Sequence, residues 1–219
     1  MRHEIKIPIQ KNFDSNFKDL INFNRNIKKS FRDRIINSIY FDTENLSLAQ
    51  NNLSGISKRS KYRIRWYNDD FKNLNYEIKF KKNNLGNKIV LKTNQDLKDL
   101  DSLYSVSNKF LNRPENIFFL DKINYYDLKP VVKISYLRSY YIYNHKVMIT
   151  YDKNLKYELI NKFELKKNVF NDSMNVIEIK FDKKDYHLGA NLIRSTDFYP
   201  KRFSKYLRSL YSFNIAKYL

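Results

Sequence analysis

The sequence of 219 residues contains no cysteine, which excludes disulfide bonds and metal sites built from thiolates. Its three histidines are scattered, at His3, His145 and His187, and do not form a histidine-rich zinc motif. Only 3 glycines and 4 prolines are present, which argues against low-complexity linkers and against a glycine-rich loop that cradles phosphates. The chain is therefore expected to be neither a disulfide scaffold nor a P-loop protein.

Long apolar stretches are also missing. The first ten residues, MRHEIKIPIQ, lack the apolar region of a signal peptide, and no later run is long enough to span a bilayer. Hydrophobic residues make up 42% of the chain and aromatic residues 16%, which is enough for a core. With no internal repeat or domain boundary in the pattern, we expect residues 1–219 to form a single domain of a cytoplasmic protein.

The charge is strongly unbalanced. Lysine and arginine total 42 against 23 aspartates and glutamates, so the formal net charge is +19. Such a charge says little about the fold, but it predicts attraction to polyanions. The candidates are nucleic acid, anionic membranes, nucleotides and inorganic phosphate chains.

Residues 61–92 alternate as three consecutive β-strands would, because successive side chains of a strand point to opposite faces. One face of these strands is strongly cationic: Arg63, Arg65, Lys79, Lys81, Lys88 and Lys92. The other face is apolar: Tyr62, Ile64, Trp66, Tyr76, Ile78, Phe80, Ile89 and Leu91. Cations on neighbouring strands repel one another, and a bound anion relieves the repulsion. The stretch therefore predicts an anion-binding face.

The remaining chain predicts further strands and helices. Strands are expected at residues 2–9, 34–43, 131–143, 146–152, 175–181 and once or twice within 155–170. Helices are expected at 14–28, 44–53, 184–195 and 201–213, and in two pieces of 96–124 divided by Pro114. Asn144 and His145 would form the turn of a hairpin.

A Glu-x-Lys unit recurs on these strands. It occurs at Glu4/Lys6, Glu77/Lys79, Glu164/Lys166 and Glu178/Lys180. One such pair is ordinary on a solvated strand, but the set shows charge on one face of strands that are otherwise aromatic and β-branched. If the strands close on themselves, the charged faces line a polar interior. The expected fold is α+β, a closed antiparallel β-barrel forming a tunnel flanked by helices.

Several short motifs in collinear order resemble a known family. They are R-x-E-x-K at residues 2–6, IYFDT at 39–43, YRIRWY with Arg63 and Arg65, EIKFK with Lys79, a strand with Lys88, PVVKISYLR with Tyr136 and Arg138, ITYD ending at Asp152, IEIKF with Glu178 and Lys180, and RFSKYLRS with Ser204 and Lys205. Together they resemble the VTC (vacuolar transporter chaperone) polyphosphate polymerase domain, within the CYTH-like triphosphate tunnel metalloenzymes.

The resemblance implies a site in which basic side chains grip a triphosphate. The residues that it implies for catalysis are Lys6, Arg63, Arg65, Lys79, Arg138 and Lys205. Those that it implies for further phosphate contacts are Lys88, Tyr136, Lys180 and Ser204. Glu178 would hold Mn²⁺ or Mg²⁺. The expected ligands are ATP or another nucleoside triphosphate and inorganic polyphosphate, and translocation of the product would need a membrane-protein partner.

The acceptor of the phosphoryl group separates two activities of such a tunnel. The end of a polyphosphate chain is already an anionic nucleophile, whereas water needs a carboxylate to orient and deprotonate it. Basic residues dominate the matched set here, with Glu4 and Glu77 as helpers beside Glu178. This balance favours a polyphosphate polymerase over a triphosphatase, which stays as the alternative.

Two other classes remain open. Asp152 followed by Glu178-Ile-Lys180 resembles the acidic constellation of metal-dependent nucleases, although the βα alternation of that fold is missing. A non-catalytic domain could instead bind nucleic acid or another polyanion through arginine and exposed aromatic rings. Most of the 18 tyrosines and 16 phenylalanines are expected in the core, so nucleic acid is the less favoured partner.

Overall fold

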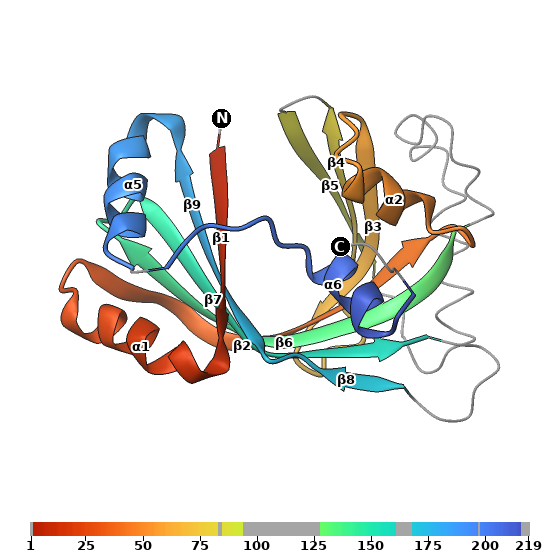
Figure 1. The fold of residues 1–219 in the computed structure, drawn as a ribbon, viewed down its shortest axis with the longest axis horizontal. Helices are drawn as coiled ribbons and strands as arrows, with labels where there is room; N and C mark the ends of the chain where they lie inside the picture. The colour runs from red at the N-terminus through yellow and green to blue at the C-terminus, as the bar shows by residue number, and fades with distance from the viewer. Residues whose placement is uncertain (1, 83–84, 94–127, 161–167, 197, 216–219) are drawn as a thin grey trace. The chain divides into compact units, whose positions relative to one another are not determined.

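A computed structural model of the chain describes residues 2–82, 85–93, 128–160, 168–196 and 198–215 (Figure 1). The strands are β1 (Arg2–Gln10), β2 (Ile27–Asp42), β3 (Arg59–Tyr67), β4 (Leu74–Lys82), β5 (Leu85–Thr93), β6 (Lys129–Tyr143), β7 (Val147–Leu159), β8 (Val169–Asn171) and β9 (Met174–Asp182). The helices are α1 (Asp14–Phe23), α2 (Ser47–Leu53), α5 (Tyr186–Arg194) and α6 (Lys205–Ser212), with short 3-10 turns η1 (Lys11–Phe13) and η3 (Lys183–Asp185).

The nine strands belong to one mostly antiparallel sheet. Its order is β1-β9-β7-β6-β2-β3-β4-β5, with β8 paired to β7. This confirms the expected antiparallel sheet with helices. The expected closed barrel is not observed, because no ladder joins β1 to β5 in the part of the chain that the structure describes. Alternation along a strand indicates its two faces, but it does not show whether the first and last strands pair.

The chain divides into two compact units. Unit 1 comprises Met1–Ile35, Ser135–Lys156 and Asn171–Ser204, and unit 2 comprises Ile36–Ile134, Tyr157–Phe170 and Lys205–Leu219. The strands β2, β6 and β7 contribute residues to both units. Each unit has its own core and its own charged face.

In unit 1, β9 pairs with β1 on one side and with β7 on the other. Alternate residues of these strands form an apolar face: Ile7, Ile9, Ile149, Ile177, Ile179 and Phe181. Phe17 of α1 and Leu192 of α5 pack on the same core, so both helices cover this face (Figure 1). The opposite face carries the charged residues of the strands, with Lys6 directly across from Glu178.

In unit 2, β3 lies between β2 and β4, and β5 follows β4. The apolar face of these strands packs on Leu48 of α2, and its buried residues include Ile39, Tyr62, Ile64, Trp66, Tyr76 and Ile78. The predicted two-faced pattern of residues 61–92 is confirmed by this core. The cationic residues are thereby directed to the other face.

The hairpin predicted at Asn144-His145 is confirmed between β6 and β7. Both residues have positive φ angles, 47° and 56°, which is the backbone of a type I′ turn. The helix expected at 14–28 is shorter, since α1 ends at Phe23 and β2 already begins at Ile27. Asn24 ends it, because its extended backbone and its side-chain bond to the Asn26 N–H, 3.1 Å, form a turn.

Strand β2 also begins earlier than the expected residue 34. Its first half is mostly exposed and lacks apolar alternation, so the pattern gave no strand signal there. The two helices expected in 96–124, divided by Pro114, lie outside the described residues. The pair Glu164 and Lys166 also lies outside them. Within the described ranges, no helix is long and apolar enough to cross a membrane.

Gly189 offers a test of how closely α5 packs on the sheet. A Cβ atom at this position would overlap the ring of Phe181, which is buried and stacked on His3 and therefore cannot swing aside. Overpacking of this kind outweighs the better helix propensity of alanine. We expect Gly189→Ala to lower the free energy of unfolding by about 1–2 kcal/mol in urea titrations. Asn191→Ala, at an exposed position of the same helix, should change it by less than about 0.5 kcal/mol.

Candidate functional site

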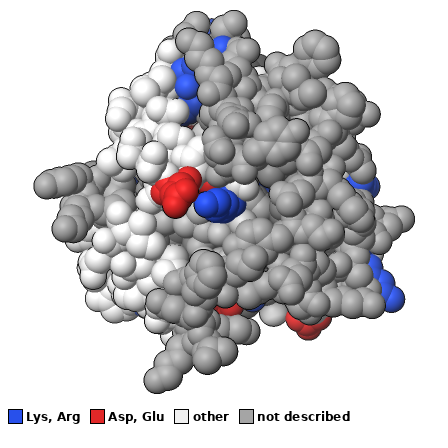
Figure 2. All heavy atoms as spheres, turned by 90° about the vertical axis from the view of Figure 1, so that its right-hand side faces the viewer, with Lys and Arg blue, Asp and Glu red and all other residues white. Residues whose placement is uncertain are grey.

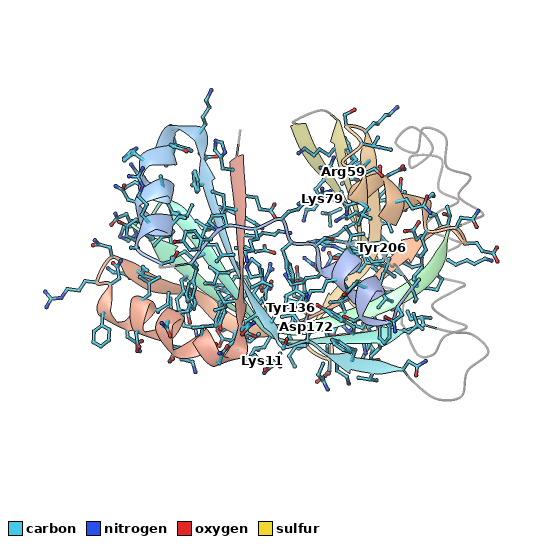
Figure 3. All side chains as sticks on the ribbon, in the orientation of Figure 1. Lys11, Arg59, Lys79, Tyr136, Asp172 and Tyr206 are labelled. Carbon is cyan, nitrogen blue, oxygen red and sulfur yellow. The ribbon has the colours of Figure 1, made fainter. Side chains whose placement is uncertain are left out.

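The charged face of unit 2 is built by strand register. The ladders place Ser38 opposite Arg65, Tyr40 opposite Arg63, Arg63 opposite Glu77, Arg59 opposite Lys81, Lys61 opposite Lys79, and Lys79 opposite Lys88. These residues share one face because cross-strand partners point the same way. Figure 3 labels Arg59 on β3 and Lys79 on β4. Four strands therefore supply a cationic surface, and the carboxylate of Glu77 lies within it.

That carboxylate, Glu77, is only 3% exposed and is surrounded by cations. Arg63 donates to Oε2 from both Nε, at 2.7 Å, and Nη2. Lys88 Nζ lies 3.3 Å from Oε1, and Arg65 Nη1 lies 3.8 Å from Oε2. We call Arg63, Arg65, Glu77 and Lys88 the Glu77 cluster.

The surrounding cations keep Glu77 ionised. Burial by itself would raise the pKa of Glu77, but the charges of Arg63, Arg65 and Lys88 and the hydrogen bonds from Arg63 outweigh it. The pKa falls to about 2. At neutral pH, Glu77 is therefore a fixed anion and a weak proton acceptor.

Two hydroxyl groups fix the guanidinium groups further. Arg63 Nη1 donates to the Tyr40 hydroxyl at 2.9 Å, and Arg65 Nε donates to Ser38 Oγ at 3.1 Å. Burial alone would raise the pKa of Tyr40, but the charges of Arg63, Arg65 and Lys205 lower it. Lys205, in α6, is itself only 8% exposed, so its charge acts close to this face.

Unit 1 has a second charged cluster, which we call the Arg138 cluster: Lys6, Arg138, Asp152, Glu178 and Lys180. Arg138 binds Asp152 through two parallel bonds, Nε to Oδ1 at 2.5 Å and Nη2 to Oδ2 at 2.6 Å. The same Nη2 lies 3.4 Å from Glu178 Oε2. Lys180 Nζ lies 3.3 Å from Oε2 of Glu178, and Lys6 Nζ lies 4.0 Å from its Oε1.

Arg138 is fixed in its charged form. Burial alone would lower the pKa of Arg138, but Tyr136, Asp152 and Glu178 raise it well above its usual value. Its guanidinium carbon lies 5.3 Å from the centre of the Tyr136 ring, a cation–π contact. The predicted phosphate ligand Tyr136 is 5% exposed and supports Arg138 directly.

The structure thus brings the sequence-predicted residues together in two sets. Unit 1 gathers Lys6, Tyr136, Arg138, Glu178 and Lys180, and unit 2 gathers Arg63, Arg65, Lys79, Lys88 and Lys205. Ser204 is half-buried just before α6, at the end of a segment that Lys6 contacts through a bond to the Phe203 carbonyl, 3.3 Å. Whether these residues bind phosphate stays a prediction.

The carboxylates of the site offer few ligands for a metal. No group of three histidine, aspartate or glutamate side chains that could hold a metal occurs in the described part of the chain. Magnesium is commonly held by one or two carboxylates together with substrate phosphates rather than by a cage of protein ligands. Glu178, a carboxylate among phosphate-binding candidates, fits that kind of site. A metal here would need phosphate oxygens as its remaining ligands.

The nuclease interpretation fits the contacts poorly. It requires Asp152 and Glu178 to share a metal, but both oxygens of Asp152 accept bonds from Arg138. On the face shown in Figure 2, a basic side chain lies beside an acidic one, next to uncharged described residues. The cations that lie on the sheet faces beside buried carboxylates are Arg63, Arg65, Lys88, Arg138 and Lys180.

Sequence reasoning missed several residues of these clusters. The sequence predicts Glu77 only as a helper of Glu178, whereas the structure shows that it pairs with Arg63, Arg65 and Lys88 of unit 2. The links from Tyr40 to Arg63 and from Asp42 to Tyr206 were not expected. The link between Tyr40 and Arg63 could be predicted from the alternation of side chains, since Tyr40 lies on the same face of the sheet as its cross-strand partner Arg63. The second joins residues 164 positions apart, and no local pattern indicates it.

A comparison with models of protein families shows the family to which this chain belongs. The model of the VTC domain matches residues 3–214, nearly the whole chain. The chain belongs to the VTC domain family. No protein of curated function matches this VTC domain in sequence.

Several solved structures share the fold of this chain. A putative adenylyl cyclase from Hippeastrum, described as having a dominant triphosphatase activity, matches with a TM-score of 0.59 and 12% identity over 98% of this chain and 96% of that one. A putative adenylate cyclase from Bacillus halodurans gives 0.55 and 14% over 92% of each chain. The PH1819 protein from Pyrococcus horikoshii OT3 gives 0.51 and 16% over 97% of each. At these identities the likeness concerns the fold alone.

The ion pairs of Glu77 predict a pH dependence of stability. Its pKa is about 2 in the folded protein against an ordinary value of 4.5, so its contribution is complete above pH 4.5 and is lost as the pH falls toward 2. That shift corresponds to about 3 kcal/mol. Glu77→Gln should therefore unfold more easily than the wild type at pH 7, and the gap should shrink as the pH falls from 4.5. Denaturant titrations across this range measure it.

Glu44→Gln is the matched control, since the Glu44 side chain is 82% exposed. Its stability should follow the wild type at every pH. A gap for Glu77→Gln that stays constant down to pH 2 would contradict the assignment of these ion pairs.

Proposed function

We propose that this VTC domain is a metal-dependent polyphosphate polymerase, which transfers the terminal phosphate of ATP to the end of an inorganic polyphosphate chain. The observation that carries the proposal is the state of the carboxylates on the two charged faces. Glu77, Asp152 and Glu178 are all ion-paired with arginine or lysine side chains. Fixed cations suit phosphoryl transfer, which depends on positioning and charge neutralisation.

The paired carboxylates favour a chain end over water as the acceptor. A general base should have a pKa near the working pH, and Glu77, with a pKa of about 2, is far below it. Asp152 uses both oxygens on Arg138. The terminal phosphate of polyphosphate is an anion that can attack without losing a proton, so it needs cations to bring it close to ATP rather than a base.

A triphosphatase is the second candidate function. It is favoured by the fold neighbour from Hippeastrum, whose description reports a dominant triphosphatase activity. The two activities use the same cations and differ in the acceptor. We therefore treat hydrolysis of ATP or inorganic triphosphate as the competing outcome in the assay below.

Each cluster has a proposed part. Arg63 and Arg65 would bind phosphate oxygens from fixed positions, and the ammonium groups of Lys79, Lys88 and Lys205 would add to them on the same face. In unit 1, Lys6, Arg138 and Lys180 would bind phosphate, supported by Tyr136 and Ser204. Glu178 would hold Mn²⁺ or Mg²⁺, which, when bound, neutralises negative charge on phosphate oxygens.

We further propose that residues 1–219 act as one domain, which the single family match over residues 3–214 supports. ATP and inorganic polyphosphate are its proposed partners. A cytoplasmic location, and a membrane protein that moves the polymer onward, complete the proposal. They follow from the family resemblance and from the source of ATP.

The purified chain should make polyphosphate from ATP in the presence of Mn²⁺ or Mg²⁺ and a short polyphosphate primer. A polymerase releases ADP and lengthens the primer, with little free phosphate. A triphosphatase releases free phosphate in proportion to ADP and leaves the primer unchanged. Gel electrophoresis of the polymer, together with ADP and phosphate assays, separates these results, and release of phosphate alone would refute the polymerase.

Glu178→Gln tests the proposed metal ligand. The substitution keeps the shape of the side chain and removes its charge, so turnover should fall about a hundredfold or more if a metal at this position stabilises the transferred phosphate. Binding of inorganic triphosphate without metal, measured by calorimetry, should persist, because the cations remain. Glu158→Gln, which breaks an ion pair with Lys133 in unit 2, is the control and should keep full turnover. Equal activity of both variants would remove Glu178 from its role.

A further inference from the structure

Helix α6 is attached to the charged face of unit 2 by one tyrosine. The ring of Tyr206 stacks on the ring of Tyr40, with centroids 5.1 Å apart and planes inclined by 9°. Tyr206 is 2% exposed, and Figure 3 labels it on α6. Tyr40 lies on the charged face, directly opposite Arg63 in the ladder between β2 and β3. The stack therefore places α6 against the side of the sheet that carries the Glu77 cluster.

The hydroxyl of Tyr206 has a specific acceptor. It donates to Asp42 Oδ2 at 2.7 Å, and Asp42 is fully buried. The same carboxylate accepts three backbone N–H groups: Thr43 at 2.8 Å, Leu48 at 2.9 Å and Ala49 at 2.9 Å. Asp42 is thus fixed by the end of β2 and by the first turn of α2. It offers Tyr206 a rigid anchor, because its own position does not depend on α6.

The anchor is close to two predicted phosphate ligands. Tyr40, under the Tyr206 ring, accepts a hydrogen bond from Arg63 at 2.9 Å. Lys205 precedes Tyr206 in the chain, is 8% exposed, and acts electrostatically on Tyr40. Loss of the bond from the Tyr206 hydroxyl would therefore move Lys205 relative to Arg63, while the ring that packs on Tyr40 remains.

A short helix needs such an anchor. With eight residues, α6 is too short to be stable through its own hydrogen bonds, so its position depends on tertiary contacts. Lysine also loses considerable rotamer freedom when it is held in one place. An apolar contact alone does not specify rotation or sliding of the helix, whereas a hydrogen bond to a fixed carboxylate does.

We propose that Tyr206 is a positioning residue, whose hydrogen bond to Asp42 sets α6 so that Lys205 and Arg63 face the same phosphate group. The inference rests on the proposed function, since it assigns Tyr206 an effect through Lys205. Tyr206 itself need not touch the substrate. The predicted consequence is a coupling between Tyr206 and Lys205 in phosphate binding and transfer.

A double-mutant cycle tests this coupling. Tyr206→Phe removes the hydroxyl and keeps the ring that stacks on Tyr40, and Lys205→Met keeps most of the side-chain volume and removes the charge. We expect Lys205→Met to lower turnover about a hundredfold, by analogy with loss of one fixed donor to developing charge. Tyr206→Phe should lower it about tenfold. The double variant should be no worse than Lys205→Met, because the hydroxyl has no further effect once the charge is gone.

The same cycle is measured by binding of inorganic triphosphate in calorimetry, which does not require turnover. Tyr211→Phe is the matched control: Tyr211 lies on the same helix, is 51% exposed, and should leave binding and turnover unchanged. Melting temperatures of all variants identify a temperature at which each is folded. A purely structural tyrosine would change melting but leave kcat and triphosphate affinity of the folded variant normal.

The outcomes distinguish a failure of the positioning role of Tyr206 from a failure of the proposed role of Lys205. Losses for Tyr206→Phe and Lys205→Met that multiply, giving about a thousandfold in the double variant, would overturn the positioning role alone. The same holds if Tyr206→Phe behaves as Tyr211→Phe does. If Lys205→Met keeps both turnover and triphosphate affinity, the proposed role of Lys205 fails, and the inference fails with it.

Discussion

The pairing of buried carboxylates with arginine is the interaction on which both charged faces depend. Several cations on neighbouring strands repel one another, and a sheet face that carries them alone would be unstable. In unit 2 the repulsion is relieved by Glu77, and in unit 1 by Asp152 and Glu178. Removing one partner of such a pair is costly, because it leaves a buried charge uncompensated. The cations can therefore be kept in place before any ligand binds.

The two-faced strands explain why these clusters form where they do. Ile64 and Ile78 are buried in the core of unit 2, so the residues beside them in sequence, Arg63, Arg65 and Glu77, must point the other way. Hydrophobic burial on one face thus determines the position of charge on the other. The same holds in unit 1, where Ile177 and Ile179 are buried on either side of Glu178.

Alternation predicted most of the strands and the cationic face of β3 to β5, whereas Arg138 and Lys205 were implied only by the family resemblance. It predicted the hairpin at Asn144 because a two-residue turn between alternating strands is a local feature. It did not predict the exposed first half of β2, which lacks alternation, or the pairing of the outermost strands, which depends on contacts far apart in sequence. The bond between Asp42 and Tyr206 was missed for the same reason. Local patterns specify faces, whereas partners across a face are specified by register and tertiary packing.

The carboxylates that hold the cations also compete with the substrate. A triphosphate that binds Arg63 must share its donors with Glu77, whose low pKa keeps it charged at any physiological pH. Arg63 donates through Nε and Nη2 to Glu77 and through Nη1 to the Tyr40 hydroxyl, so its guanidinium group is held in a fixed orientation on this face. A guanidinium group carries five N–H donors on three nitrogens, whereas the three donors of a lysine share one nitrogen. The arginines are therefore suited to remain fixed by carboxylates while they bind phosphate, and the lysines are suited to move between the two.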